Sequence, residues 1–150
     1  MRVVLQRVIE ASVKIDGSTK SSIENGVLIF IGIESADSEL DADWIISKIS
    51  GLRIFSDKEG KMNLSIKDVK GSFLVISQFT LFASTKKGNR PSYIQAARPE
   101  QAIPLYEYFV SNLKSETNLT VETGEFGADM KVSLVNDGPV TITIDSKNKE

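Results

Sequence analysis

The sequence contains no cysteine and no histidine among its 150 residues. Without cysteine there can be no disulfide, no zinc–thiolate site and no thiol nucleophile. Without histidine there can be no Ser-His-Asp triad, no imidazole general base and no imidazole metal ligand. Any chemistry must therefore use other side chains (Thr, Ser, Lys, Tyr or carboxylates), the main chain, or a group on the substrate itself.

Long apolar runs are also missing. No run approaches the roughly 20 residues that a bilayer-spanning helix needs. The N-terminal stretch MRVVLQRVIEASVKI lacks the apolar core and small-residue cleavage site of a signal peptide. We therefore expect a cytoplasmic protein without a membrane partner. The carboxylates are scattered without the spacing of metal ligands, so we expect no metal and no cofactor.

The charge balance is slightly acidic, with a formal net charge of −2. This value argues against broad nonspecific binding to nucleic acid. Acidic residues are nevertheless absent from residues 69–99, which hold the cations Lys70, Lys86, Lys87, Arg90 and Arg98. A basic patch can therefore form on an acidic protein.

The totals suit one globular domain, since 41% of the residues are hydrophobic and 25% are charged. We find no linker, repeat or low-complexity segment. We expect a single domain over residues 1–145, followed by a polar C-terminal tail over residues 146–150.

Apolar residues alternate or cluster as in strands, and two stretches have helical spacing. The expected strands are 2–15, 19–24, 27–33, 52–55, 71–83, 119–122 and two runs within 132–144. The expected helices are 37–50 and about 99–116, although Pro104 leaves the start of the second helix open. This order predicts an α/β (mixed α and β) fold with a strongly bent, barrel-like mixed β-sheet and two main helices packed outside it.

The segment Val132–Ile144 has two interpretations. Period-two alternation on both sides of Asn136-Asp137-Gly138-Pro139 favours a plain hairpin turn. Pro139, however, has no N–H to donate to a ladder, and Gly138 can adopt angles that other residues avoid. The alternative is a main-chain device that presents carbonyl groups to a ligand.

The segment SQFTL interrupts an apolar strand with Ser77, Gln78 and Thr80. Alternation alone explains polar side chains on a solvated face. The functional interpretation is a pocket at the strand end, where free main-chain N–H groups form an oxyanion hole. Thr80 is a poor candidate for a nucleophile, because the chain offers no histidine to act as its base.

These segments, together with MRVVLQRVIEASVKIDG, GLRIFSDKEGKMNLSIKD, RPSY, LYEYFV and TGEFGADMKVSLVNDGPVTITI, resemble the D-aminoacyl-tRNA deacylases, formerly called D-tyrosyl-tRNA deacylases. The resemblance runs from Met1 to about Ile144. It implies a homodimer, with the active site at the subunit interface, that cleaves D-aminoacyl-tRNA and also glycyl-tRNA mischarged on tRNA-Ala. It further implies that L-aminoacyl-tRNA is rejected and that the 2′-hydroxyl of the terminal adenosine assists water.

The resemblance also assigns roles to residues. It places the oxyanion hole at the main-chain N–H groups of Phe79 and Thr80, and the pocket wall at Ser77 and Gln78. The chiral filter would be a cis Gly138-Pro139 fixed by Arg7, and the adenosine would be held by Phe126 and Met130. Lys86, Lys87 and Arg90 would contact tRNA phosphates.

Simpler interpretations stay open for several of these residues. Phe126 and Met130 can serve in packing, Arg7 can be a surface charge, and cations in loops are usually solvated. Two rival functions also stay open. One is a noncatalytic dimeric RNA-binding module, and the other is a hydrolase of another small ester or amide that uses Asp129 or Asp137 as base.

Overall fold

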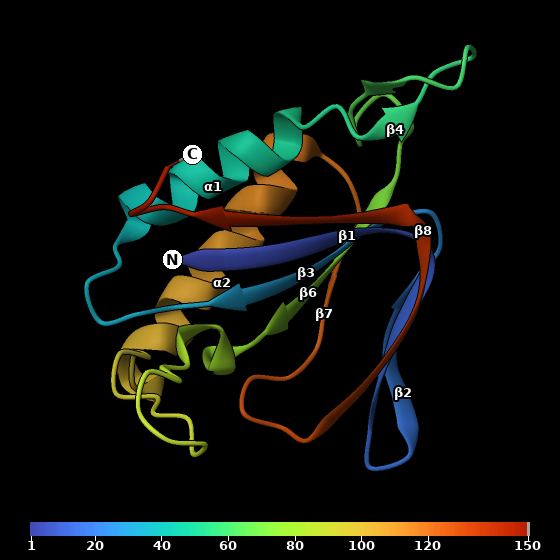
Figure 1. The fold of residues 1–150 in the computed structure, drawn as a ribbon. Coiled ribbons are helices and arrows are strands. Elements are labelled where there is room, and N and C mark those ends of the chain that lie inside the picture. Colours follow the sequence, from blue (N-terminus) through green and yellow to red (C-terminus); the bar gives the residue numbers. More distant parts are fainter. Residues whose placement is uncertain (150) are drawn as a thin grey trace.

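The computed structural model describes residues 1–149, and Glu150, the last residue of the expected tail, lies outside the described residues. A six-stranded sheet has the order β2-β1-β3-β6-β7, with β8 also paired to β1 (Figure 1). Its strands are β1 (Arg2–Ile15), β2 (Ser18–Ile23), β3 (Gly26–Gly32), β6 (Ser72–Ser77), β7 (Val121–Thr123) and β8 (Met130–Asp145). A separate arm carries β4 (Phe55–Ser56) and β5 (Met62–Leu64).

The sheet is mixed and nearly closed. β3–β6 and β6–β7 are parallel pairs, whereas β1 pairs antiparallel with β2, β3 and β8. The two ends of the strand order approach each other, because the Ser21 hydroxyl on β2 donates to the Thr123 carbonyl on β7 at 2.7 Å. The predicted fold class, a bent barrel-like mixed sheet with two main helices, is confirmed.

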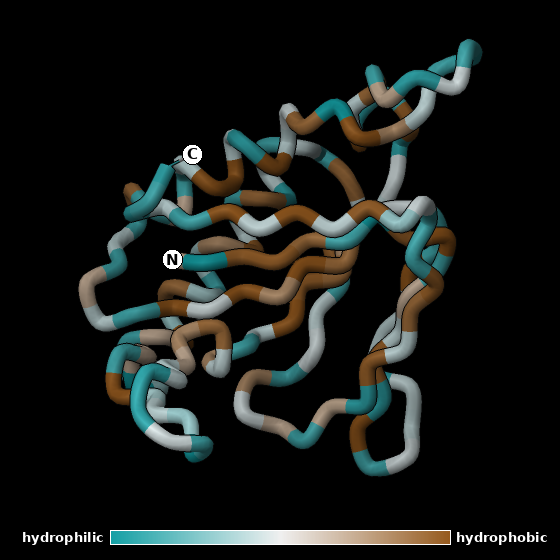
Figure 2. Tube along the Cα trace, viewed as in Figure 1, coloured by the Kyte–Doolittle hydropathy of each residue, from teal (hydrophilic) through white to brown (hydrophobic). Residues whose placement is uncertain are grey.

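Both faces of the central strands are buried, as the continuous apolar run in β3 predicts. Val27, Ile29 and Ile31 belong to the core beneath the helices α1 (Glu39–Gly51) and α2 (Pro99–Thr117). Leu28, in contrast, belongs to a second core inside the bent sheet. Figure 2 shows the hydrophobic segments concentrated along these strands, with polar segments in the loops.

The expected strand over residues 71–83 is wrong beyond Ser77. β6 ends there, and Phe79–Phe82 forms the 3-10 turn η1. The neighbouring strand β3 ends at Gly32, so the chain after Gln78 has no ladder to join. A Cβ on Gly32 would lie 3.0 Å from both the Gln78 carbonyl oxygen and the Leu81 Cβ. The glycine therefore lets η1 pack closely against the end of β3.

The plain-hairpin interpretation of Val132–Ile144 is also wrong. Both halves of β8 pair with β1, so they do not pair with each other. Thr141 lies opposite Gln6 and Asn136 lies opposite Val8, which extrudes residues 137–140 beside Arg7. The Gly138–Pro139 peptide bond within this loop is cis.

Helix α2 begins at Pro99 and continues through Pro104, which settles the doubt about its start. At the far edge of the sheet, residues beyond β8 are docked onto the fold. The Ser146 hydroxyl is an acceptor for the Met1 ammonium group, which also pairs with the buried Asp37 carboxylate. Lys147 Nζ lies 2.9 Å from the Asp41 carboxylate in α1. The described part of the polar tail is thus fastened to the helix layer, and both chain ends lie close together (Figure 1).

Candidate active site

A cavity of about 590 Å³ opens where β6 ends. Its walls include Ser77, Gln78 and Phe79 from the end of β6 and the start of η1. Phe126, from the loop between β7 and β8, and Met130, the first residue of β8, also line it. Five of the predicted site residues, distant in sequence, therefore surround one cavity of the size that small-molecule sites have.

The turn η1 exposes main-chain donors beside this cavity. Leu81 is the first residue whose N–H bonds back into the turn, to the Gln78 carbonyl at 3.3 Å. The N–H groups of Phe79 and Thr80 precede it and have no partner within the turn, as the first N–H groups of any helical turn do. Two adjacent donors of this kind can stabilise a developing oxyanion.

The Thr80 side chain is engaged by its neighbour. Its hydroxyl oxygen accepts a hydrogen bond from Gln78 Nε2 at 2.6 Å. Neither a carboxylate nor an amine bonds to this hydroxyl in residues 1–149, so the described residues offer it no general base. In the structure the Thr80 side chain is thus held by Gln78 within the turn, and its main-chain N–H has no partner in that turn.

Phe126 is braced from behind by α2. The Tyr106 ring packs against the Phe126 ring in an edge-to-face arrangement, with the centroids 6.0 Å apart. The Tyr106 hydroxyl donates to the Val75 carbonyl at 2.8 Å, and burial raises the pKa of Tyr106. Tyr106 therefore stays a neutral donor, and it ties α2, β6 and the Phe126 loop together.

Met130 owes its position to Gly124. A Cβ on Gly124 would lie 2.4 Å from Met130 Sδ and 3.1 Å from Ile76 Cδ1. With glycine at this point the thioether can occupy the place that a Cβ would take. Gly124, which the sequence pattern does not mark, thus shapes the wall of the cavity.

The extruded loop over residues 137–140 lies apart from this cavity, since none of its residues lines it. Arg7, which is 7% exposed, holds the loop from the strand side. Its Nε donates to the Asp137 carbonyl at 2.8 Å and lies 3.1 Å from the Asp137 carboxylate. Its second donor bonds to the Ile54 carbonyl at 2.5 Å. The surface-charge interpretation of Arg7 is wrong, because the side chain is a buried strut.

Asn136 closes the loop with its side-chain amide. Its Oδ1 accepts the Val140 N–H at 2.8 Å, and its Nδ2 donates to Gln6 Oε1 at 2.8 Å and to the Val140 carbonyl at 3.2 Å. Gly138 and Pro139 are left exposed at the tip. The fold thus presents these two residues outward on a fixed base.

The three predicted phosphate-binding cations do not line the cavity. Lys86, Lys87 and Arg90 are exposed in a loop that Ser84 and Ser92 close by pairing their main chains. Sequence reasoning missed Tyr93 and Arg98, which line the cavity. The motif RPSY contained the signal for Tyr93, because an aromatic residue in a polar loop is unusual.

The proposed carboxylate bases are both occupied. Asp129 lines the cavity rim, but Lys131 Nζ lies 2.7 and 2.9 Å from its two oxygens. Asp137 faces Arg7 instead of the cavity. In the described part of the chain, no group of three or more Asp, Glu, His or Cys side chains could hold a metal ion.

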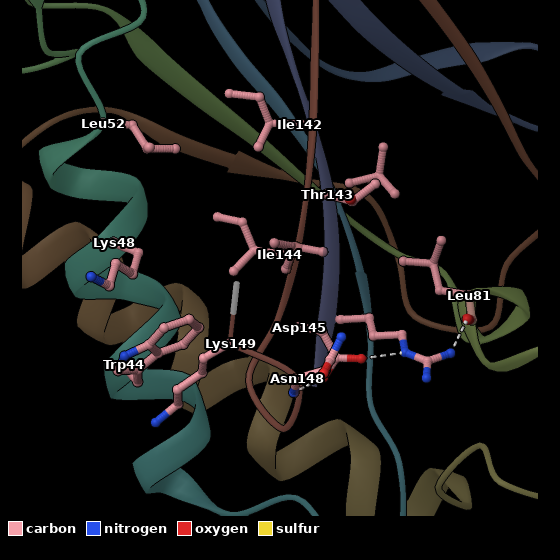
Figure 3. Close-up of a pocket in the computed structure, with 13 residues that line it drawn as sticks. Trp44, Lys48, Leu52, Leu81, Ile142, Thr143, Ile144, Asp145, Asn148 and Lys149 are labelled. Atoms are coloured by element: carbon pink, nitrogen blue, oxygen red, sulfur yellow. Dashed lines mark hydrogen bonds and ion pairs between the residues drawn. The ribbon is translucent and has the colours of Figure 1, made fainter.

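A larger cavity of about 710 Å³ lies between α1 and β8, around Trp44 and Ile142 (Figure 3). It contains none of the predicted site residues. Arg2 connects it with the donor turn, because its Nη1 donates to the Leu81 carbonyl at 3.2 Å while its Nε pairs with Asp145 at 2.7 Å. Arg2, in the wall of this larger cavity, thus helps to hold η1 in place. We regard the first cavity as the candidate active site.

The fold and this site define a class of protein, a compact α/β enzyme whose cavity offers main-chain donors and aromatic walls. A family model described as D-Tyr-tRNA(Tyr) deacylase matches residues 4–145. The chain belongs to this family, and it is accordingly a hydrolase.

Individual relatives match along the whole chain. The D-aminoacyl-tRNA deacylases of Flavobacterium psychrophilum and Bacteroides fragilis are 62% and 63% identical to it, with all of each chain covered. A solved structure described as c-Myc DNA Unwinding Element Binding Protein has 38% identity and a TM-score of 0.91, over 97% of this chain and 98% of that one. Among the described residues, no helix has the length and apolar character to cross a membrane.

Proposed function

We propose that this protein is a homodimeric, cytoplasmic editing hydrolase that cleaves the ester between a D-amino acid, or glycine, and tRNA. The observation that carries the proposal is the pair of main-chain donors at the start of η1, where Phe79 lines a cavity with aromatic walls and Thr80 follows it in the chain. Ester hydrolysis needs an acceptor site for the negative charge that develops on the carbonyl oxygen. These donors supply it without a titrating side chain.

The base would come from the substrate. The described cavity offers no free base, so the 2′-hydroxyl of the terminal adenosine would assist the attack of water on the neighbouring 3′-ester. An intramolecular hydroxyl held at the reacting carbon has a high effective concentration. Ser77 and Gln78 would shape the pocket for the ester, while Phe126 and Met130 would hold the adenine by stacking and packing.

Selection between D- and L-aminoacyl groups would depend on Gly138 and Pro139. Their carbonyl groups would meet the α-carbon of the substrate where an L-amino acid carries its side chain. A hydrogen fits there, so D-aminoacyl groups and glycine enter and L-aminoacyl groups clash. This is selectivity by rejection, which suits an enzyme that must spare the abundant correct substrate. Arg7 and Asn136 support the proposal by giving the loop a fixed base.

The proposed homodimer is supported by the position of the Gly138-Pro139 loop, which does not reach the cavity of its own chain. No residue of 137–140 lines the chain's own cavity, yet Gly138 and Pro139 are exposed and directed outward. A second copy related by two-fold symmetry could place this loop over the cavity of the first. Sedimentation equilibrium tests this directly, and a monomer with full activity would contradict it.

The exposed cations Lys86, Lys87 and Arg90 would contact phosphates of the acceptor stem. They lie in a stretch that contains no acidic residue, beside Ser92 and Tyr93 at the cavity. Phosphate contacts position a nucleic acid and make its binding depend on salt. Replacing them by Gln should therefore weaken tRNA binding most at low salt.

The decisive experiment is deacylation of D-Tyr-, L-Tyr- and Gly-charged tRNA under matched conditions. We expect cleavage of the first and third and sparing of the second. A D-Tyr-tRNA that ends in 2′-deoxyadenosine should be cleaved poorly, since the assisting hydroxyl is gone. Equal cleavage of the D and L substrates would exclude the filter, and tRNA binding without any cleavage would instead support a noncatalytic RNA-binding module.

A further inference from the structure

Two aromatic rings stand open at the mouth of the cavity. Phe79 is 56% exposed and Tyr93 is 38% exposed, and both line the cavity. Their rings meet edge to face, with centroids 5.1 Å apart and an interplanar angle of 71°. Each ring thus restricts the orientation of the other, and both rings keep solvent-exposed surface. Open aromatic surface beside a binding cavity calls for a ligand that continues beyond the cavity.

The same rim carries positive charge. Arg98 lines the cavity next to the start of α2, and no ion pair or hydrogen bond engages its guanidinium in residues 1–149. Asp129 is a carboxylate that also lines this cavity, and Lys131 Nζ pairs with it at 2.7 Å. Glu100 follows in the first turn of α2. The cavity mouth therefore combines an unpaired planar cation with an exposed ring.

We propose that Tyr93, in edge-to-face contact with Phe79, is a stacking platform for the nucleobase next to the terminal adenosine, and that Arg98 binds the phosphate between the two nucleotides. This inference rests on the proposed function, because it takes the cavity as the pocket of the terminal adenosine. Aromatic stacking joined to a cationic groove is how proteins hold single-stranded nucleic acid without reading its sequence. The platform suits this enzyme because every acceptor end is single-stranded, whatever the tRNA.

The binding of uncharged nucleotides tests the platform apart from catalysis. The probes are adenosine 5′-monophosphate and the trinucleotide CCA, and wild-type protein should bind CCA about tenfold more tightly or better. Tyr93→Ala should reduce this advantage to nearly nothing, and Tyr93→Phe should keep it, because the ring and not the hydroxyl stacks. Ile94→Ala is the matched control, since Ile94 follows Tyr93 in the chain, is 90% exposed and does not line this cavity.

Arg98 is tested by salt. Arg98→Gln should weaken CCA binding several-fold at low salt, and the slope of log affinity against log salt should fall by about 0.7. Lys58→Gln, on the distant arm between β4 and β5, is the control for net charge. An unchanged slope in Arg98→Gln would overturn the phosphate assignment.

Two results would overturn the platform while leaving the deacylase function intact. In the first, wild type cleaves D-Tyr-tRNA but binds CCA no better than the monophosphate. In the second, Tyr93→Ala changes the sedimentation of the protein and not the CCA advantage, which would assign the ring pair to a contact between copies. If wild type binds neither nucleotide and cleaves no ester, both the platform and the proposed function fail.

Discussion

The side-chain amide of Asn136 holds both polar main-chain groups of Val140. Its Oδ1 accepts the Val140 N–H at 2.8 Å, and its Nδ2 donates to the Val140 carbonyl at 3.2 Å. The amide takes the place of a missing ladder pair, because Pro139 has no N–H and the loop over residues 137–140 leaves β1. Local side-chain bonds to the main chain commonly fix such excursions.

Asn136→Asp should loosen this loop. A carboxylate keeps the acceptor for Val140 but loses the donor to Gln6 and to the Val140 carbonyl. We expect the ratio of D-Tyr-tRNA to L-Tyr-tRNA deacylation rates to fall by about tenfold. The melting temperature should fall as well, because two hydrogen bonds of the amide are lost. Asn63→Asp, at an exposed position in β5, should change neither quantity. An undiminished ratio in Asn136→Asp would separate the amide from the filter.

Gly138→Ala should be more severe. Gly138 has φ +150°, and an added Cβ would lie 2.7 Å from the N and the Cγ2 of Val140. The loop must shift to accept the methyl group, so the D to L ratio should fall by at least tenfold. Gly17→Ala is a control for backbone strain, because Gly17 has φ +79° but its Cβ would meet no atom within 4 Å. If Gly138→Ala kept the full D to L ratio, the loop would have no part in the discrimination.

Thr80→Val should leave the deacylation rate within about tenfold of wild type. The substitution removes the hydroxyl that Gln78 engages and keeps the main-chain N–H. Losing a true nucleophile typically costs on the order of 10⁴-fold or more in kcat. Single-turnover deacylation of D-Tyr-tRNA measures this, and a loss of that size with normal tRNA binding would restore covalent catalysis by Thr80.

Gly124→Ala should affect binding more than chemistry. The new Cβ would lie 2.4 Å from Met130 Sδ, so the thioether, which belongs to a residue of the cavity wall, must shift. We expect a several-fold rise in KM for D-Tyr-tRNA with a nearly unchanged kcat. Gly51→Ala, where a Cβ meets nothing within 4 Å, is the control. A fall in kcat at constant KM would place Met130 beside the reacting ester.

Asp41 should stabilise the fold in a pH-dependent way. Burial alone would raise the pKa of Asp41, but hydrogen bonds from Lys147, Ser146 and Ser38 outweigh it and hold this pKa below the usual 3.8. A depressed pKa contributes stability above the unfolded value, and this contribution disappears as the pH falls below about 4.

Asp41→Asn should therefore lower the unfolding free energy at pH 7 by about 1.5 kcal/mol, or Tm by on the order of 4 °C. The difference from wild type should shrink toward zero below pH 4 in thermal melts. Glu59→Gln is the matched control. Glu59 pairs with Lys61 at 3.2 Å, but both side chains are about 75% exposed, so this ion pair should contribute little. A constant difference across the pH range would exclude the linkage.

The sequence predicts the elements that depend on local pattern. The apolar run of β3 and the alternation of β1 are visible in the chain, as are the stripes of α1 and α2. The residues around the cavity could be named because they belong to recognisable motifs.

The sequence does not predict what depends on distant partners. FTLF has the composition of a strand but forms η1, because β3 stops at Gly32 and offers no ladder beyond it. The two halves of β8 look like a hairpin but pair with β1, whose length is not apparent from the turn. Tyr93 and Arg98 lie in a polar loop without periodicity, so the sequence marks Tyr93 only as an unusual aromatic residue, and the folded chain shows that both line the cavity.

Strand β1 contacts both η1 and the loop over residues 137–140. Arg2 of β1 holds the donor turn at Leu81, and Arg7 of the same strand holds the filter loop at Asp137. A strand rises about 3.3 Å per residue, so the Cα atoms of Arg2 and Arg7 lie roughly 17 Å apart along β1. Inserting or deleting a single residue between them would shift η1 relative to residues 137–140. Such a change should therefore alter both proposed properties together, the deacylation rate and the selection between D and L substrates.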